Sequence, residues 1–563
     1  MSLGFASLLL TNLIMLIAPQ ILQRAIDTLR VSSDPGSLPI HAMLFVLVMV
    51  VQGVFRYMVR QTIGVVSRRI EYDLRNDLYR CLQSLPLAYY HKNRTGDIMS
   101  RLTNDLGSVR NLLGPGIMYS ANALILFVAA LAVMLSMNVA LTLMALIPMI
   151  VLPLFSNRMS KRLYDRSRAV QEQIAVLSGM AQETVAGVRV IKAYQREEAA
   201  FDRFCAASRE YVEKCMGLVR VEGAIWPLMG AIAGLSSVIV VWYGGLRVID
   251  NELTLGELVA FEAYLGYLMW PLMAFGWVIN VAQRGKASMT RLTELLDAPG
   301  QDGRTEPEDR ETVFRGHIEF RNLTFSYNDG VPVLENISFT LEPGKTLAVV
   351  GPTGSGKSTL VNLISRLYDP LPKTVFLDGH DVLSLPLRRL REAVGAVPQD
   401  TFLFSRTIAG NIAYGVPEAT ADEIRKAAET ARIDHDIAGF PNRYETKIGE
   451  RGVTLSGGQK QRTAIARAVL SDPVVLILDD CLSNVDTYTE EEILQRMRVF
   501  MKDRTTLIVA HRISSIKHAD RVLVLEHGRI VEQGDHGTLL ANGGLYARMY
   551  EKQRLQVSLA ETT

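Results

Sequence analysis

A glycine-rich stretch in the second half of the chain has residue types and spacing that could do chemistry. It reads GPTGSGKST from Gly351 to Thr359, follows a β-branched apolar run, and fits the phosphate-binding pattern G-x-x-x-x-G-K-[ST]. Such glycines let backbone N–H groups surround an anion at the positive end of a helix, which we expect to begin at Lys357. Lys357 is predicted to reach the β- and γ-phosphates of a nucleoside triphosphate, and the Ser358 hydroxyl to hold Mg²⁺. The predicted nucleotide-binding residues here are Gly351, Pro352, Thr353, Gly354, Ser355, Gly356, Lys357, Ser358 and Thr359.

A second apolar run ends in a carboxylate. Val474–Leu478 reads VVLIL and is followed by Asp479. Many parallel strands end in Asp, so this signal is weak alone, but after a phosphate loop it predicts a buried strand whose Asp479 binds Mg²⁺ through water or together with Ser358.

A third stretch predicts another anion cradle. The run LSGGQ is followed by Lys460, Gln461 and Arg462. A serine and two glycines at the start of a helix present a hydroxyl and backbone N–H groups to an anion. Five matching residues make this pattern more specific than the others; they are Leu455, Ser456, Gly457, Gly458 and Gln459.

Length and composition place these motifs in a larger context. The chain has 563 residues, so we expect two to four domains. Its apolar content of 48% is high for a soluble protein. A net charge of +2 does not indicate a nucleic-acid partner. The four cysteines have no CxxC or Cys/His spacing, which argues against a zinc site or a disulfide framework.

Six apolar runs in the first half predict membrane spans, since a span needs about 20 apolar residues. The second predicted span, Ala42–Val59, has the weakest signal because a charged residue, Arg56, lies within it. Residues 1–23 carry no charged side chain and no basic segment precedes them, so we expect a retained membrane helix rather than a signal peptide, with an N-terminal piece missing from this sequence. The predicted spans are Leu3–Gln23, Ala42–Val59, Ile117–Met137, Val139–Phe155, Gly223–Leu246 and Leu258–Gln283.

The connections after spans two and four are long, helical in pattern and rich in basic residues, as in Arg68–Arg101 and Arg158–Lys192. The positive-inside rule puts both in the cytoplasm. We therefore predict a transmembrane domain over 1–296, a polar linker over 297–315, and an α/β domain with a largely parallel sheet over 316–563.

The three motifs and the six spans together resemble the ATP-binding cassette family, and the resemblance covers essentially the whole chain. A six-helix transmembrane α domain of exporter type, fused to an α/β P-loop nucleotide-binding domain, is similar to a half-transporter. In this family two cassettes close head to tail, and ATP lies between the phosphate loop of one and the LSGGQ of the other. The resemblance implies ATP and Mg²⁺ as cofactors.

The resemblance assigns further roles by motif. Tyr327 resembles the aromatic that stacks on adenine, and Gln399 the residue that senses Mg²⁺ and the membrane domain. His511 resembles the switch histidine at the γ-phosphate, while Ser483 and Asp486 lie in the loop that crosses the dimer interface. The implied catalytic set is Asp480, His511 and Gln399; the implied metal set is Ser358, Gln399 and Asp479.

Segments outside the nucleotide site also match the family. Thr95–Asp105 and Glu183–Tyr194 resemble the two coupling regions that contact the cassette, and Ile448–Gly452 resembles the cassette segment that touches the cytoplasmic loops.

One position departs from the family pattern. The residue after Asp479 is usually Glu, the carboxylate that positions or deprotonates the attacking water, but here it is Asp480, one methylene shorter. A misplacement of about 1 Å can cost on the order of 10²-fold in rate. An impaired base beside an intact LSGGQ resembles the degenerate subunit of a heterodimeric exporter, whose partner keeps the Glu. A homodimer in which Asp480 is a working base is the alternative.

We therefore predict a half-subunit of an ATP-driven exporter in the cell (inner or plasma) membrane, with its cassette in the cytoplasm. Its partners are a second half-transporter, the lipid bilayer and a hydrophobic or amphipathic cargo (drug, lipid or peptide), with no nucleic acid. A nucleotide-gated channel, an importer of exporter shape and a soluble ATPase acting on nucleic acid are the competing functions. One apolar set either lines an adaptable cargo path or simply packs the helices: Trp226, Met229, Trp270, Met273 and Asn280.

Overall fold

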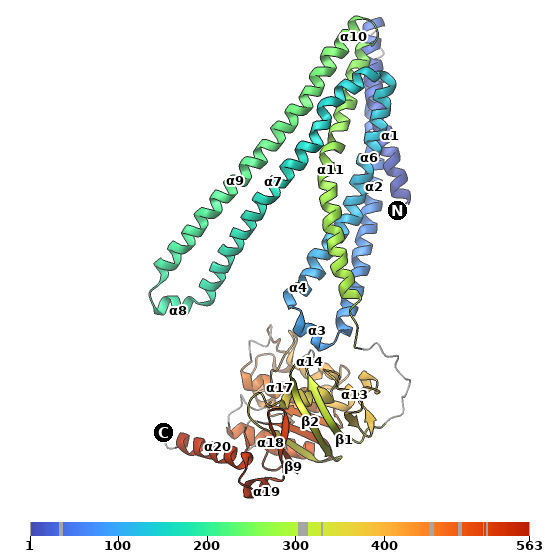
Figure 1. The fold of residues 1–563 in the computed structure, drawn as a ribbon. Coiled ribbons are helices and arrows are strands. Elements are labelled where there is room, and N and C mark those ends of the chain that lie inside the picture. Colours follow the sequence, from blue (N-terminus) through green and yellow to red (C-terminus); the bar gives the residue numbers. More distant parts are fainter. Residues whose placement is uncertain are drawn as a thin grey trace. The chain divides into compact units, whose positions relative to one another are not determined.

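The chain divides into two compact units (Figure 1). The first comprises Met1–Gln83 and Asn93–Ala298, and the second Ser84–Lys92 and Pro299–Thr563. The computed structural model describes residues 2–32, 38–301, 313–327, 330–449, 455–481, 487–510, 512–513 and 516–561.

Six long helices dominate the first unit. They are α1 (Ser2–Ser32), α2 (Leu38–Ser84), α6 (Ile117–Met137), α7 (Val139–Ala186), α9 (Glu197–Ile239) and α11 (Leu255–Leu296). Among the described residues, six helical stretches are long and apolar enough to cross a membrane, which confirms the predicted number of spans. The weakest predicted span is part of α2, which continues as one unbroken helix through Arg56 into its charged half.

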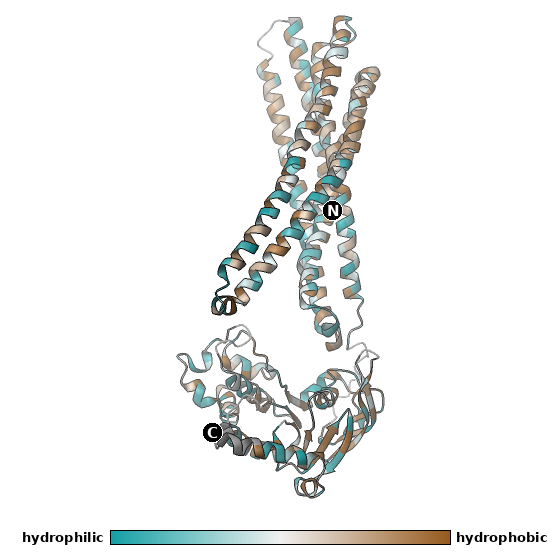
Figure 2. Cartoon of the chain, turned by 60° about the vertical axis from the view of Figure 1, so that its left-hand side comes forward, coloured by the Kyte–Doolittle hydropathy of each residue, from teal (hydrophilic) through white to brown (hydrophobic). Residues whose placement is uncertain are grey.

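Short segments join these helices. They are α3 (Leu87–Lys92), α4 (Thr95–Ser100), α5 (Leu106–Asn111), α8 (Val188–Ala193), α10 (Gly245–Ile249) and three π-helical turns, Arg101–Asp105, Leu112–Gly116 and Val240–Gly244. Figure 1 shows α7 and α9 as a long antiparallel hairpin with α8 at its tip. Both predicted long basic connections are therefore helical extensions of the spans. In Figure 2 hydrophilic residues, coloured teal, become more frequent along the lower stretches of these helices.

The first unit has an apolar core formed mainly by α6, α7 and α11, including the fully buried Phe261 and Tyr264. The Tyr264 hydroxyl donates to the Leu16 carbonyl at 2.7 Å, which ties α11 to α1. By contrast, none of the most apolar stretch of α2 is buried within the chain. Such side chains suit a surface that faces acyl chains or another subunit.

The second unit contains two sheets. The larger has the order β10-β9-β3-β8-β7-β6, parallel except for β10, and the smaller is antiparallel with the order β2-β1-β4-β5. The strands are β1 (Ile318–Ser326), β2 (Pro332–Leu341), β3 (Thr346–Val350), β4 (Val375–Leu377), β5 (His380–Asp381), β6 (Val394–Val397), β7 (Val475–Asp479), β8 (Thr505–Val509), β9 (Arg521–Glu526) and β10 (Arg529–Gly534). The largely parallel sheet was predicted, but its strand β6 and the separate antiparallel sheet were missed.

Helices cover the larger sheet, and apolar clusters lie on its two faces. The α-helices of this part of the chain are α12 (Lys357–Ile364), α13 (Leu387–Ala393), α14 (Ile408–Ile412), α15 (Ala421–Thr430), α16 (Asp434–Ala438), α17 (Gly457–Leu470), α18 (Thr487–Met501), α19 (His536–Ala541) and α20 (Leu545–Glu561). The predicted fold class, a six-helix membrane domain with an α/β P-loop domain, is confirmed.

Candidate nucleotide site and membrane helices

The glycine-rich stretch forms a turn between the buried strand β3 and α12, as predicted. Two of its glycines permit close backbone approaches. Gly351 has φ +151°, and a Cβ there would lie 2.0 Å from the Leu525 carbonyl oxygen. Gly356 caps α12 at φ +97°, and a Cβ there would lie 2.6 Å from Leu334. Larger residues at either position would distort the loop.

Polar groups inside this loop suit a phosphate. Lys357 is 6% exposed, and its Nζ donates to the carbonyls of Gly351 at 2.9 Å and Pro352 at 2.8 Å. Burial lowers the pKa of Lys357, although the charges of Asp479 and Asp480 act in the opposite direction. The Ser355 hydroxyl is buried and has no hydrogen-bond partner among the described residues. A bound phosphate would give both side chains an anionic partner.

Two carboxylates follow β7, whose five residues are all buried. Asp479 pairs with Val509 of the neighbouring parallel strand β8, and Asp480 donates its N–H to the Val509 carbonyl at 2.8 Å. Asp480 has φ +43°, a left-handed conformation that is strained for a residue with a Cβ.

The structure brings Gln399 to this edge of the sheet. Its Nε2 donates to Asp480 Oδ2 at 3.2 Å. Ser358 is exposed at the start of α12, whereas Asp479 is 7% exposed. Hydroxyl, amide and carboxylate oxygens are ligands that Mg²⁺ accepts, so this set fits the metal that usually accompanies ATP.

The predicted adenine-stacking residue lies in an aromatic group. The Tyr327 hydroxyl donates to Thr359 Oγ1 at 3.0 Å, and its ring packs edge-on against Tyr368 at 4.9 Å between centroids. Tyr368 also stacks with His91 of α3 at 6.2 Å. Neither Tyr368 nor His91 was predicted, because no motif marks an aromatic residue whose role is to pack against another.

The LSGGQ stretch begins α17 as predicted. Ser456 is the N-cap: its Oγ accepts from the Gln459 N–H at 3.2 Å, and its own N–H donates to Gln459 Oε1 at 3.0 Å. This reciprocal capping box satisfies two donors that the helix leaves unpaired. Asp436 of α16, which sequence reasoning missed, accepts from Gln459 Nε2 at 2.9 Å and from Arg462 at 2.8 Å.

Some predicted residues lie outside the described parts of the chain. They are His511, Ser483, Asp486 and residues 450–452 of the loop-contacting segment. Their assigned roles remain predictions.

In the membrane unit, Thr95–Asp105 belongs with the long helices, and Asp105 accepts from Ser288 Oγ at 2.8 Å and from Arg291 Nε at 2.9 Å. The neighbouring segment Ser84–Lys92 belongs instead to the second unit, where the Gln301 N–H donates to the Ser84 carbonyl at 2.7 Å. A role in coupling for Thr95–Asp105 stays a prediction, and the sequence did not single out α3.

The predicted cargo-path residues have different surroundings. Met229 is buried in the apolar core and Met273 packs against it, whereas Asn280 is exposed. Trp270 lines a cavity between α1, α2, α6 and α11. The Trp226 side chain lies outside the described parts.

Six membrane helices in one chain with a phosphate loop, a carboxylate-ended strand and an LSGGQ helix define an ATP-driven membrane transporter. Residues 1–272 match the ABC transporter transmembrane region and residues 334–483 the ABC transporter family. The chain belongs to the ABC transporter family.

Relatives and a solved structure agree with this assignment. The chain is 38% identical over 553 residues to a probable multidrug resistance ABC transporter ATP-binding/permease protein of Bacillus subtilis, covering 97% of this chain and 94% of the relative. It is 38% identical over 476 residues to a fatty acid ABC transporter ATP-binding/permease protein of Mycobacterium bovis, covering 84% and 75%. A bacterial Atm1-family ABC exporter with ATP bound has a TM-score of 0.82 and 29% identity, with 98% of both chains covered.

The protein is therefore a multi-pass membrane protein and an ATPase coupled to transport, of the exporter type. Exporters of this family work as dimers in a lipid bilayer and move hydrophobic cargo.

Proposed function

We propose that this chain is one half of a heterodimeric exporter in the plasma membrane, with its cassette in the cytoplasm and a catalytically impaired ATP site of its own. Its cargo is a hydrophobic or amphipathic drug, lipid or peptide. The multidrug and fatty acid transport named for two relatives supports this range of cargo. The basic character of the connections after spans two and four supports the cytoplasmic cassette.

Each motif has a part in this proposal. Lys357 and the loop N–H groups bind the phosphates, and Tyr327 stacks on adenine. Ser358, Asp479 and Gln399 would hold Mg²⁺, which neutralises charge on the β- and γ-phosphates when bound. The LSGGQ helix α17 completes the ATP site of the partner subunit, so closure of the two cassettes on ATP favours the outward-open form and hydrolysis resets it.

The observation that carries the asymmetry is Asp480. Its carboxylate follows β7 and accepts a hydrogen bond from Gln399, but its side chain is a methylene shorter than the usual Glu. The LSGGQ motif, by contrast, is intact, and its Ser456 is the N-cap of α17.

Steady-state ATPase of the purified, assembled transporter tests this proposal. We expect Asp480→Asn to change turnover by less than about twofold, because this site contributes little, and Gly457→Asp to lower turnover by about 10²-fold or more, because it blocks the partner's site. Asp503→Asn, an exposed carboxylate of the same cassette, is the matched control. If Asp480→Asn abolishes hydrolysis as Gly457→Asp does, Asp480 is a working base and the homodimer is the better assignment.

A further inference from the structure

The membrane unit contains a cavity of about 530 Å³ between α1, α2, α6 and α11. This volume is within the range of small-ligand sites. Much of its wall is apolar or aromatic, and its apolar members include Leu8, Met15, Val59, Met118, Leu126 and Trp270. Such a wall accepts a hydrocarbon chain.

One part of the wall is polar and buried. Asn12 is 1% exposed, and its Nδ2 donates to the Leu8 carbonyl at 2.9 Å and to Asn122 Oδ1 at 3.1 Å. Both asparagines line the cavity, and among the described residues no acceptor is found for the Asn122 Nδ2. An amide donor therefore remains available at the wall of the cavity.

Two arginines line the same cavity from α2. Arg56 and Arg60 are one helical turn apart, so they share a face of the helix and repel each other. Neither has a carboxylate within 4.0 Å among the described residues, whereas Arg68 and Arg75 further along α2 both pair with Glu71. Both arginines are exposed, so their guanidinium groups can form charged hydrogen bonds with a carboxylate or phosphate.

Their depth adds to this argument. Leu38–Phe55 has no acidic residue, Lys or Arg and rises about 27 Å as a helix, close to the thickness of the hydrocarbon layer. Arg56 therefore lies where acyl chains meet head groups. An arginine at this depth extends its guanidinium into the head-group layer while its methylene stem stays among acyl chains, so it can meet an anionic head group.

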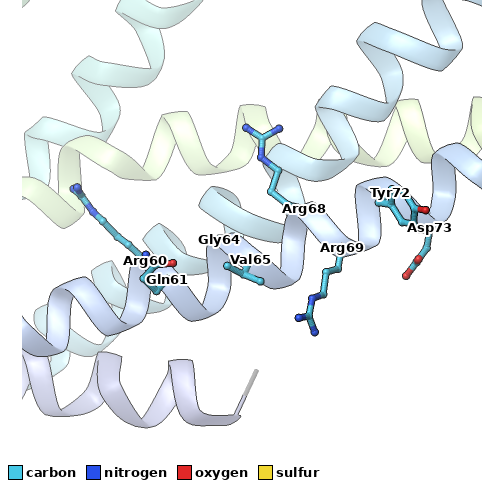
Figure 3. Close-up of a pocket in the computed structure, with 8 residues that line it drawn as sticks. All are labelled: Arg60, Gln61, Gly64, Val65, Arg68, Arg69, Tyr72 and Asp73. Carbon is cyan, nitrogen blue, oxygen red and sulfur yellow. The ribbon is translucent and has the colours of Figure 1, made fainter.

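Arg60 also lines a shallow hollow of about 500 Å³ along the charged half of α2. Figure 3 shows that its residues all come from this one helix, and that Arg60, Arg68 and Arg69 point away from it in different directions. This open surface is not a site by itself, but its basic side chains give anions an approach to Arg60.

We propose that this cavity binds an amphiphile whose head group is a carboxylate or phosphate, held by Arg56, Arg60 and the Asn122 amide, with its tail along the apolar wall. The inference rests on the proposed exporter function and narrows its cargo to anionic amphiphiles. A cationic amphiphile of the same length is rejected, because it would bring a third positive charge to an uncompensated pair.

The experiment measures equilibrium binding to the assembled transporter in nanodiscs of neutral lipid. The probes share one C18 chain: oleate, oleyl phosphate, oleyl alcohol and oleylamine. We expect wild type to bind the two anions at least tenfold more tightly than the alcohol or the amine. The ratio of oleate to oleyl phosphate identifies the preferred head group.

Two variants and one control make the test specific. Arg56→Gln with Arg60→Gln should weaken oleate binding about ten- to hundredfold and leave oleyl alcohol unchanged. Arg56→Glu with Arg60→Glu should reverse the preference toward oleylamine, a gain that loss of fold cannot produce. Arg158→Gln removes an exposed arginine at the end of another apolar run, on α7, and should change nothing.

Equal binding of oleate and oleyl alcohol by wild type, or an equal loss in Arg158→Gln, overturns the proposal. ATP-dependent movement of a neutral lipophilic dye across proteoliposomes is measured in parallel. If the dye moves while head-group selectivity is absent, the exporter function is supported and the proposed anionic site is wrong. If head-group selectivity is present but no probe or dye moves with ATP, the anionic site is supported and the proposed exporter function is wrong.

Discussion

Gln399 Nε2 lies 3.2 Å from Asp480 Oδ2, although the two residues are 81 positions apart in the chain. The contact joins the loop after β6 to the end of β7, two adjacent parallel strands. It holds the Asp480 carboxylate beside the residues that would bind Mg²⁺.

Removing this amide tests its role in metal binding. Gln399→Ala deletes one donor to Asp480 and one oxygen that could bind the metal, a loss of about 1 kcal/mol. We expect the Mg²⁺ concentration that half-saturates nucleotide photolabelling of this subunit to rise about fivefold. Gln533→Ala, a change in β10 where the glutamine contacts Arg521, should have no effect. An unchanged Mg²⁺ dependence in Gln399→Ala would remove this residue from the metal set.

Lys357→Ala should weaken ATP binding at this chain's own site. The change removes a buried ammonium that can exchange its two carbonyl partners for phosphate oxygens, and charged hydrogen bonds of this kind are worth about 1.5–3 kcal/mol. The apparent Kd for photolabelling should rise about ten- to hundredfold. Lys345→Ala is the matched control, since Lys345 is exposed and pairs with Asp520 at 3.0 Å. Undiminished labelling of Lys357→Ala at sub-saturating ATP contradicts the assignment.

The pair formed by Asp105 and Arg291 should stabilise the membrane unit. Asp105 is 7% exposed and takes hydrogen bonds from both Arg291 and Ser288. Asp105→Asn leaves the arginine without its counter-charge, so we expect a loss of about 1–3 kcal/mol and a lower Tm in detergent. Asp77→Asn removes an exposed i,i+3 pair with Arg80 and should have little effect. A double-mutant cycle with Arg291→Gln should give a coupling energy, and strict additivity would mean that the two residues act independently.

Cys481 should resist thiol reagents. Burial raises the pKa of its thiol from 9.0 to about 12, so at neutral pH it is protonated as well as inaccessible. We expect maleimide to label Cys205, which is partly exposed, well before Cys481 in the native transporter. Mass spectrometry of peptides after timed labelling measures both rates. Equal rates would contradict the buried position of Cys481.

The same shift predicts a dependence on alkaline pH. Because the folded-state pKa is raised, the protonated thiol stabilises the fold fully below about pH 9, and this contribution is lost as the pH rises from 9 toward 12. Between pH 8 and about pH 10, the Tm of Cys481→Ala should therefore fall less than the Tm of wild type. Parallel pH profiles for the two proteins would show that this thiol does not contribute.

Local patterns explain which parts of the fold were predictable. The apolar run Thr346–Val350 and the glycines after it specify their strand, turn and helix without help from distant residues, and they were placed correctly. The strand Pro332–Leu341 was missed because it is stabilised by antiparallel pairing with β1, and its partly exposed positions give no continuous apolar run.

Contacts between distant residues explain the rest. The spacing of motifs gave Gln399 and Asp480 separate roles, but only the sheet order places them in contact. Nothing in the local sequence of Asp436 marks it as a support for the LSGGQ helix, and Arg56 appeared in the sequence as a defect in a membrane span rather than as a cavity wall. Side-chain environments of this kind are set by which helices and strands pack together.

In the capping box, the Ser456 hydroxyl can take part in two hydrogen bonds, one as acceptor and one as donor. Its lone pair accepts the Gln459 N–H, while its own proton remains available to an anion. A substitution to alanine would therefore weaken the start of the helix and the contact to a partner's nucleotide together, and the two losses could not be separated. Threonine keeps the hydroxyl and the cap, whereas aspartate keeps the cap but has no proton to donate to a phosphate. Comparing the two replacements distinguishes a loop that merely folds from one that also touches the phosphate.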